Sequence, residues 1–123
     1  MKILHTTNNE KVTEFLKKNN ANAERVELTG ATLWSVAVEE GKVIGVAGAN
    51  IGKYADRIKG FFVIKEYRRK GIGTELLQDI LGHTKAKKIT AFCTRDSENL
   101  FVKNGFAVTR AMDKQGISFV ERG

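Results

Sequence analysis

Three cations and two glycines stand close together near the middle of the chain. Arg68, Arg69 and Lys70 come directly before Gly71, and Gly73 follows two residues later. The cations attract an anion, and an arginine offers a fork of donors that matches phosphate oxygens. Because glycine has no Cβ, its backbone can approach a phosphate closely and can adopt a positive φ. This spacing predicts an anion-binding site, and a diphosphate is the natural ligand.

The segments on either side of this turn are predicted to hold it in place. The uninterrupted apolar run from Phe61 to Ile64 is typical of a strand buried on both faces. After the glycines, the apolar residues between Leu76 and Leu81 lie on one face of a helix, which we predict over residues 76–83. The first N–H groups of a helix have no partner within it, and they carry the positive end of the helix dipole. Strand, basic glycine turn and helix therefore form one anion-binding unit.

Two common nucleotide-binding turns do not match these residues. The chain contains no Gly-Lys-Ser or Gly-Lys-Thr, which a Walker A loop requires, and Leu76 stands where a Rossmann turn has its third glycine. The order Arg68-x-x-Gly71-x-Gly73 resembles a turn of the GCN5-related N-acetyltransferases (GNAT family). The family's usual form is Arg or Gln, two residues, Gly, one residue, and Gly or Ala, after a buried strand. In that family the turn holds the pyrophosphate of acetyl-CoA.

A second stretch carries the same resemblance. The sequence SENLFVKNGF, from Ser97 to Phe106, is similar to the family's second landmark. We predict a helix from Glu98 to Asn104, with Ser97 as its N-cap and Gly105 as the glycine that ends it. The residues that carry the likeness are Asn99, Phe101, Lys103, Gly105 and Phe106.

The resemblance implies an α/β (α+β) fold. It would be a single GNAT-like domain over residues 1–123, with a mixed central sheet, an antiparallel meander, two splayed parallel strands and flanking helices. In the family, the pantetheine arm of the cofactor lies in the gap between the splayed strands, and Val63 matches the residue that pairs with it. The residues that the resemblance assigns to cofactor binding are Phe62, Val63, Ile64, Arg68, Arg69, Lys70, Gly71, Ile72, Gly73, Thr74, Asn99 and Phe101.

The rest of the residue pattern agrees with such a sheet. A helix is predicted over residues 8–19, with Asn8 or Asn9 as its cap. A hairpin turn is predicted from Glu39 to Lys42, and the structure of residues 25–28 is left open. A strand, a crossover helix and a returning strand imply a parallel pair with a right-handed connection. Strands are predicted over residues 1–4, 32–38, 43–50, 56–64, 88–93, 106–111 and 117–121.

The resemblance also implies a reaction. An acetyl group would pass from acetyl-CoA to a primary amine by direct attack, so the protein must position both and assist proton transfer. Many family members place a tyrosine near the CoA sulfur, and we match that position to Val102, which has no proton to donate. Arg57 matches the usual position of a strand glutamate that acts as base, and Asp56 faces the opposite side of the strand. We therefore assign no acid or base, and a base acting through water remains an alternative.

The other reactive side chains favour structural interpretations. Cys93 fits a small buried core residue better than a group beside the cofactor, and Trp34 fits the core. His5 follows the first strand and is expected at the surface, and His83 is expected in the last turn of a helix. Two histidines far apart and one cysteine do not have the spacing of metal ligands, so no metal is predicted.

Composition limits the class of protein. The chain has 123 residues, of which 41% are hydrophobic and 28% charged, as expected for one globular domain. It contains no apolar run near the roughly 20 residues of a membrane span, and its N-terminus lacks the apolar core of a signal peptide. The single cysteine excludes an intrachain disulfide, so a cytoplasmic location is expected. The net charge of +7 suits polyanions, which include both CoA and nucleic acids.

Three functions remain in competition. The first is an acetyl-CoA-dependent N-acetyltransferase that acts on a small-molecule or protein amine. The second is a non-catalytic CoA-binding or regulatory module of the same fold, which the valine at position 102 motivates. The third and least favoured is a nucleic-acid binder, because the chain has no basic motif interleaved with aromatic residues. We expect no membrane partner and a monomer or homodimer, and the identity of the acceptor stays open.

Overall fold

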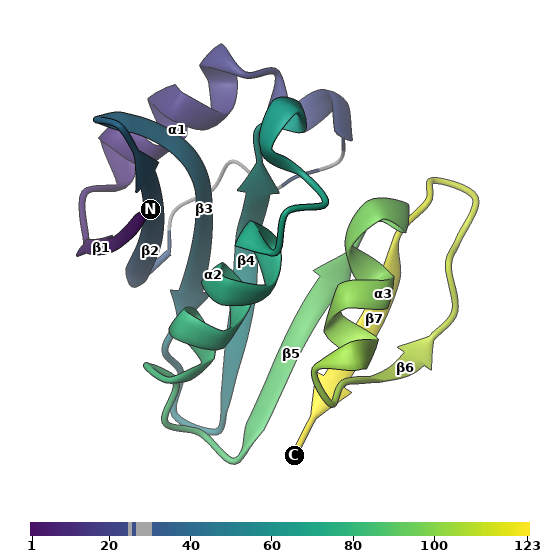
Figure 1. Ribbon diagram of the computed structural model, residues 1–123. Helices are drawn as coiled ribbons and strands as arrows, with labels where there is room; N and C mark the ends of the chain where they lie inside the picture. Colours follow the sequence, from purple (N-terminus) through teal and green to yellow (C-terminus); the bar gives the residue numbers. More distant parts are fainter. Residues whose placement is uncertain (25, 27–30) are drawn as a thin grey trace.

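The computed structural model describes residues 1–24, 26 and 31–123, so most of the segment 25–28 lies outside the described residues. It shows one mixed sheet with helices against both faces (Figure 1). The helices are α1 (Asn9–Lys18), α2 (Ile72–Leu81) and α3 (Arg95–Lys103), with short 3-10 helices at Ala21–Glu24 and Lys65–Tyr67. The strands are β1 (Lys2–Thr6), β2 (Leu33–Glu39), β3 (Lys42–Asn50), β4 (Ala55–Val63), β5 (Lys88–Cys93), β6 (Ala107–Arg110) and β7 (Ser118–Arg122).

The sheet has the strand order β1-β2-β3-β4-β5-β7-β6. The first four strands form an antiparallel meander, β4 and β5 are parallel, and β7 lies antiparallel between β5 and β6. Helix α2 connects the parallel pair, as the strand–helix–strand pattern predicts. The predicted hairpin between β2 and β3 is confirmed, since Glu40 and Gly41 have φ values of +49° and +77°. The α/β class, the meander and the flanking helices are confirmed.

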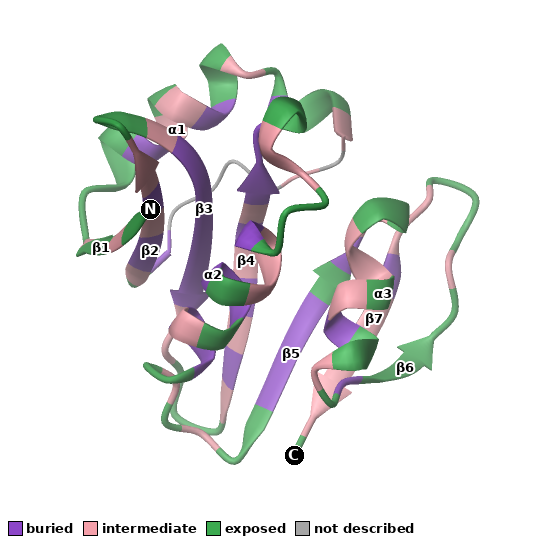
Figure 2. Cartoon of the chain, in the orientation of Figure 1, coloured by how far each residue is buried: buried purple, intermediate pink, exposed green. Residues whose placement is uncertain are grey.

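Two apolar clusters pack against the two faces of the sheet, and the central strands are buried between them (Figure 2). On one face, α2 buries Leu76, Leu77 and Ile80 completely. On the other, α1 packs Leu16 against Trp34, which is also completely buried, as expected. The indole Nε1 of Trp34 donates a hydrogen bond of 2.7 Å to Asn9 Oδ1, so its one polar atom is paired.

Strand β4 contains a bulge that opens the sheet. Val46 pairs with Phe62 and Gly48 pairs with Lys59, so one residue of β3 faces two residues of β4, Gly60 and Phe61. Gly60 has a φ of +66°, which glycine adopts without strain. The parallel pairing of β4 with β5 stops at Ile58, just before this bulge. Because a bulge bends its strand, β4 and β5 separate beyond this point, and the predicted splay is confirmed (Figure 1).

The ends of α2 differ from the prediction. The helix begins at Ile72, directly after the first glycine, and ends at Leu81, whereas the apolar stripe predicted residues 76–83. His83 therefore lies beyond the helix, and its N–H bonds to the carbonyl of Ile80 in a tightened final turn. A stripe of apolar residues reveals only the turns of a helix that are buried. The first turn of α2 buries only Ile72, so the stripe did not include it. Gly73 thus belongs to the helix itself and not to the loop before it.

The prediction for the start of α3 was wrong. The helix begins at Arg95 and not at Glu98, and its N-cap is Thr94. Ser97 lies in the first turn, where its Oγ accepts a hydrogen bond of 3.0 Å from the backbone N–H of Thr94. This is one arm of a capping box, which places Ser97 three residues after the cap. The sequence therefore predicted the N-cap at Ser97, about one turn after the true N-cap at Thr94.

The other end of α3 follows the prediction. Gly105 has a φ of +93°, and the N–H of Phe106 bonds to the carbonyl of Phe101 at 3.1 Å. The N–H of Gly105 bonds to the carbonyl of Val102, which completes a Schellman motif. This ending turns the chain so that Phe106 packs edge-to-face against Phe101.

Candidate active site

A cavity of about 350 Å³ opens between the separated ends of β4 and β5. One side is formed by Phe61, Phe62 and Val63 at the end of β4, and the basic turn adds Arg68, Arg69 and Gly73. Five of the residues that the sequence assigned to cofactor binding therefore meet around this space. They are Phe62, Val63, Arg68, Arg69 and Gly73.

The two glycines of the turn are needed for different reasons. Gly71 has a φ of +82°, which glycine adopts without strain, and a Cβ there would meet no atom within 4 Å. Glycine is therefore needed at position 71 for its backbone conformation and not for space. Gly73 is limited by space, because a Cβ there would lie 3.2 Å from Leu100 Cδ2 and 3.4 Å from Phe61 Cζ. Helix α2 starts between them at Ile72, so its unpaired first N–H groups lie in this turn. This arrangement can bind an anion, because N–H groups at the start of a helix are free to donate hydrogen bonds to it.

Arg68 is bound to the protein itself. Its Nε donates a hydrogen bond of 2.7 Å to the carbonyl oxygen of Val63, and its Nη2 lies 2.8 Å from Glu24 Oε1. The guanidinium also lies over the ring of Phe62, 5.3 Å from its centroid. Arg68 thus fastens the turn to the end of β4 and to the 3-10 helix that contains Glu24. These contacts use its Nε and Nη2 nitrogens.

The other predicted cofactor residues have different positions. Lys70 is exposed, and it lies with Gly71, Ile72 and Thr74 in the turn and the first turn of α2, outside the cavity wall. Ile64 is buried, and its N–H bonds to the carbonyl of Ile44. Asn99 is exposed on α3 and does not line the cavity.

Helix α3 provides the facing wall, which the sequence largely missed. Thr94, Asp96, Ser97 and Leu100 line the cavity from the first two turns of this helix. The missed signal was the Thr94-x-x-Ser97 spacing, because a capping box there starts the helix earlier and turns these residues toward β4. The positive end of a second helix dipole is therefore also close to the cavity.

A smaller chamber of about 40 Å³ continues beside the bulge of β4. Phe61, Phe92 and Phe101 line it, together with the hydroxyl-bearing Thr94 and Ser97. Val102, which was matched to the family's tyrosine, is 43% exposed and lines neither cavity. Beside Ser97, Phe101 of α3 also lines the chamber. This side chain, too, has no proton to donate.

Among the described residues, the charged side chains near this chamber do not form an acid–base pair. Arg57 and Arg110 lie over the ring of Phe92, at 4.9 Å and 5.6 Å from its centroid. Asp56 is completely buried and accepts backbone N–H groups of Gly52, Lys85 and Ala86. Burial opposes its ionised form, but these hydrogen bonds outweigh burial and lower the pKa of Asp56. Asp56 is therefore a structural carboxylate.

Cys93 is a buried core residue, as the sequence favoured. Its side chain is completely inaccessible in the apolar cluster beneath α3. Burial raises the pKa of the Cys93 thiol to about 12, which a hydrogen bond from Ser97 opposes and the charge of Glu98 reinforces. A thiol in this state does not act as a nucleophile near neutral pH.

The prediction of distant histidines was wrong. His5 on β1 and His83 after α2 have ring centroids only 4.5 Å apart. The two residues are far apart in sequence, but β1 pairs with β2, and β2 contacts the last turns of α2 through Ser35 and Asp79.

Among the described residues, no helix is long and apolar enough to cross a membrane.

Comparison with known proteins identifies the family. The model of the Acetyltransferase (GNAT) domain matches residues 3–121. The chain belongs to the GNAT acetyltransferase family. It is 30% identical over 107 residues to "Probable N-acetyltransferase camello" of Xenopus tropicalis, a match that covers 78% of this chain and 48% of that protein. The chain thus spans about half the length of this curated relative.

Solved GNAT structures share the fold at low sequence identity. Escherichia coli ElaA superposes with a TM-score of 0.77 at 11% identity, and the match covers 100% of both chains. N-acetylglutamate synthase from Neisseria gonorrhoeae superposes with a TM-score of 0.73 at 12% identity, covering 99% of this chain and 35% of that one. These likenesses establish the GNAT fold, including the mixed sheet with its flanking helices.

Proposed function

We propose that the protein is an N-acetyltransferase that moves an acetyl group from acetyl-CoA to a primary amine. The observation that carries this proposal is the cavity at the splay, which joins the open edge of β4 to the basic turn before α2. The N-acetylglutamate synthase named above was solved in complex with coenzyme A and N-acetyl-glutamate, and its GNAT fold supports the same cosubstrate here. Membership of the GNAT acetyltransferase family supports acyl transfer.

The cofactor would extend from the turn into the splay. The diphosphate binds the first N–H groups of α2 at Ile72, Gly73 and Thr74, and Arg69 and Lys70 supply positive charge. The pantetheine arm lies along the edge of β4 that β5 leaves unpaired, so its amides pair with backbone groups as an added strand would. The thioester then reaches the chamber that Phe61 and Phe101 line.

The reaction would proceed by direct attack. The lone pair of the amine forms a bond to the acetyl carbon while the carbon–sulfur bond breaks, and the electron pair leaves with the sulfur. A backbone N–H of β4 polarises the carbonyl oxygen, water accepts the proton of the amine, and the thiolate takes a proton from solvent. Cys93 takes no part, because its thiol is buried and its pKa is raised to about 12.

Calorimetric titration with acetyl-CoA tests the cofactor site. We expect wild-type protein to bind, and Lys70→Glu to bind about tenfold more weakly, because it reverses a charge beside the diphosphate. The matched control is Lys103→Glu, which makes the same change at an exposed lysine in the last turn of α3. Its affinity should match the wild type. Equal loss in both variants would indicate a general charge effect and would count against the site.

A non-catalytic CoA-binding or regulatory module of the same fold is the second candidate. The apolar Phe101 favours it, because this residue of α3 lines the chamber and cannot donate a proton. Release of free CoA thiol with a panel of small-molecule and peptide amines separates the two functions. Turnover that is amine-dependent and weakened in Lys70→Glu supports the enzyme. Binding without turnover across the panel supports the module.

A further inference from the structure

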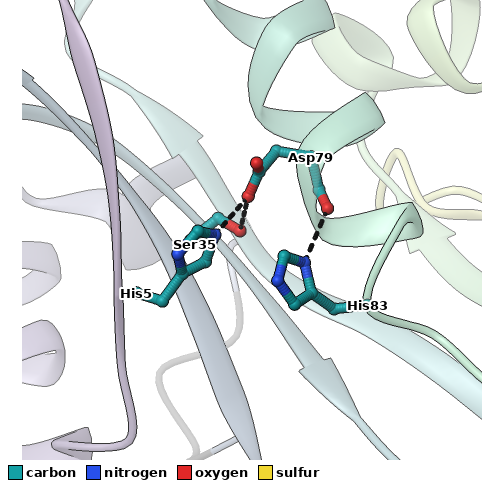
Figure 3. A network of polar contacts seen from close by, with 4 residues as sticks. All are labelled: His5, Ser35, Asp79 and His83. Atoms are coloured by element: carbon teal, nitrogen blue, oxygen red, sulfur yellow. Dashed lines mark hydrogen bonds and ion pairs between the residues drawn. The ribbon is translucent and has the colours of Figure 1, made fainter.

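Three possible metal ligands from distant parts of the chain meet beside the edge of the sheet. His5 comes from the edge strand β1, Asp79 from the last turns of α2, and His83 from the segment after that helix (Figure 3). One ligand atom of each residue lies within 4.8 Å of the others. The two histidines are exposed and Asp79 is half-buried, so the cluster is open to ions from solvent.

The contacts of this cluster orient its side chains. Asp79 Oδ2 lies 2.6 Å from His5 Nε2, and the hydroxyl of Ser35 on β2 donates to the same oxygen at 2.6 Å. His83 Nδ1 lies 2.9 Å from the backbone carbonyl oxygen of Asp79. A carbonyl oxygen only accepts, so this nitrogen carries the proton and the lone pair of His83 Nε2 is available to a metal. A hydrogen bond from the other ring nitrogen is a regular feature of metal-binding histidines.

The carboxyl group of Asp79 is suited to be a ligand in its ionised form. Ser35 is completely buried, and its hydroxyl holds Oδ2 of the carboxylate in place. Asp79 therefore meets the bound ion as a charged and oriented donor.

We propose that His5, Asp79 and His83 bind a divalent transition-metal ion of the zinc type, with solvent completing the coordination. Two imidazoles and one carboxylate are a donor set that Zn²⁺ accepts and that Mg²⁺ does not favour. A tetrahedral ion with bonds of about 2.1 Å needs ligand atoms about 3.4 Å apart. The ligand atoms lie within 4.8 Å of one another, so binding an ion requires the side chains to rotate to this spacing and the contact of 2.6 Å between His5 Nε2 and Asp79 Oδ2 to open.

The site would fasten β1 to the rest of the domain. This strand pairs only with β2 among the strands of the sheet, and the cluster adds a link from it to α2 on the helix-covered face. The metal binds the folded chain, in which the three residues meet, and therefore stabilises it by mass action. The site is separate from the cofactor cavity, so the inference does not depend on the proposed acetyl transfer.

Calorimetric titration of untagged, metal-stripped protein with ZnCl₂ tests the site, with MgCl₂ as the comparison ion. We expect one Zn²⁺ per chain and no measurable Mg²⁺ binding. His5→Gln, His83→Gln and Asp79→Asn should each weaken Zn²⁺ binding by more than about 100-fold, and Ser35→Ala by about 10- to 100-fold. The matched control is Glu98→Gln, which removes a carboxylate from α3 and should leave Zn²⁺ affinity unchanged.

The visible absorption of bound Co²⁺, measured together with Trp34 fluorescence, separates loss of metal binding from loss of folding in a less stable variant. Wild-type protein should show the intense visible bands of four-coordinate Co²⁺ without a thiolate charge-transfer band, and His83→Gln should lose them while Trp34 fluorescence reports a folded core. Absence of Zn²⁺ binding by the wild type would overturn the proposal. So would Zn²⁺ affinity that is unchanged in both histidine variants, or a thiolate band that Cys93→Ala removes.

Discussion

Arg68 provides a quantitative test of how the basic turn is held. Its side chain makes a charged hydrogen bond to the carbonyl of Val63, a half-buried ion pair with Glu24 and a stacking contact with Phe62. A hydrogen bond from a charged donor is worth about 1.5–3 kcal/mol, and the ion pair and stacking contact add about 0.5–1 kcal/mol each. We therefore expect Arg68→Ala to lower the free energy of unfolding by about 3 kcal/mol.

Two further variants divide this loss. Arg68→Lys keeps the charge near Glu24 but has no fork to reach Val63 at the same time, so it should cost about 2 kcal/mol. Glu24→Gln removes only the ion pair and should cost about 0.5–1 kcal/mol. Urea unfolding followed by the fluorescence of Trp34, the single and completely buried tryptophan, measures all three. With a slope of about 2 kcal/mol/M, the midpoint of Arg68→Ala should fall by about 1.5 M.

The ranking of the variants is the stringent part of this prediction. A loss below about 1 kcal/mol in Arg68→Ala would show that Arg68 does not fasten the turn. A loss in Glu24→Gln as large as in Arg68→Ala would place the stabilisation in the ion pair and not in the bond to β4. Either result would refute the structural role assigned to Arg68.

Three other outcomes follow from the same structure. The pKa of Asp56 is lower in the folded protein than in the unfolded chain, so ionised Asp56 stabilises the fold above about pH 4, and this stabilisation is lost as the pH falls through the lowered pKa. Urea unfolding should therefore show that the difference in free energy of unfolding between wild type and Asp56→Asn becomes smaller in acid. Cys93 should resist alkylation by iodoacetamide in folded protein and react in urea, and Cys93→Ala should keep acetyl transfer within a few-fold of wild type. Gly71→Ala should lower the free energy of unfolding by about 1–2 kcal/mol, because it forces a side chain into a left-handed conformation; a loss in calorimetric unfolding below about 0.3 kcal/mol would contradict that account.

Local pattern was enough to predict most of the fold. The spacing of hydrophobic residues and the residues typical of turns predicted the antiparallel meander and the parallel crossover. Gly105 marked the end of α3, because a Schellman motif requires a residue with a positive φ. The glycine turn was also readable, since Gly71 and Gly73 lie where a strand pattern gives way to a helix pattern. These features depend on neighbours in sequence, which a single chain displays directly.

Long-range packing decided what the sequence did not predict. The bulge at Gly60 depends on how β4 pairs with β3, and a glycine in a strand does not by itself fix that register. The sequence did not predict the contacts of Arg68 with Val63 and Glu24, because they form only in the folded chain. His5 and His83 seemed unrelated for the same reason, since only the strand order brings β1 beside the end of α2.

The measurement closest to the central claim is a crystal structure of the protein with acetyl-CoA. We predict that the diphosphate accepts hydrogen bonds from the first N–H groups of α2 and that the pantetheine arm lies along the edge of β4 beyond Ile58. The thioester should reach the chamber beside Phe101. A diphosphate bound elsewhere, or a pantetheine arm outside the gap between β4 and β5, would contradict this account.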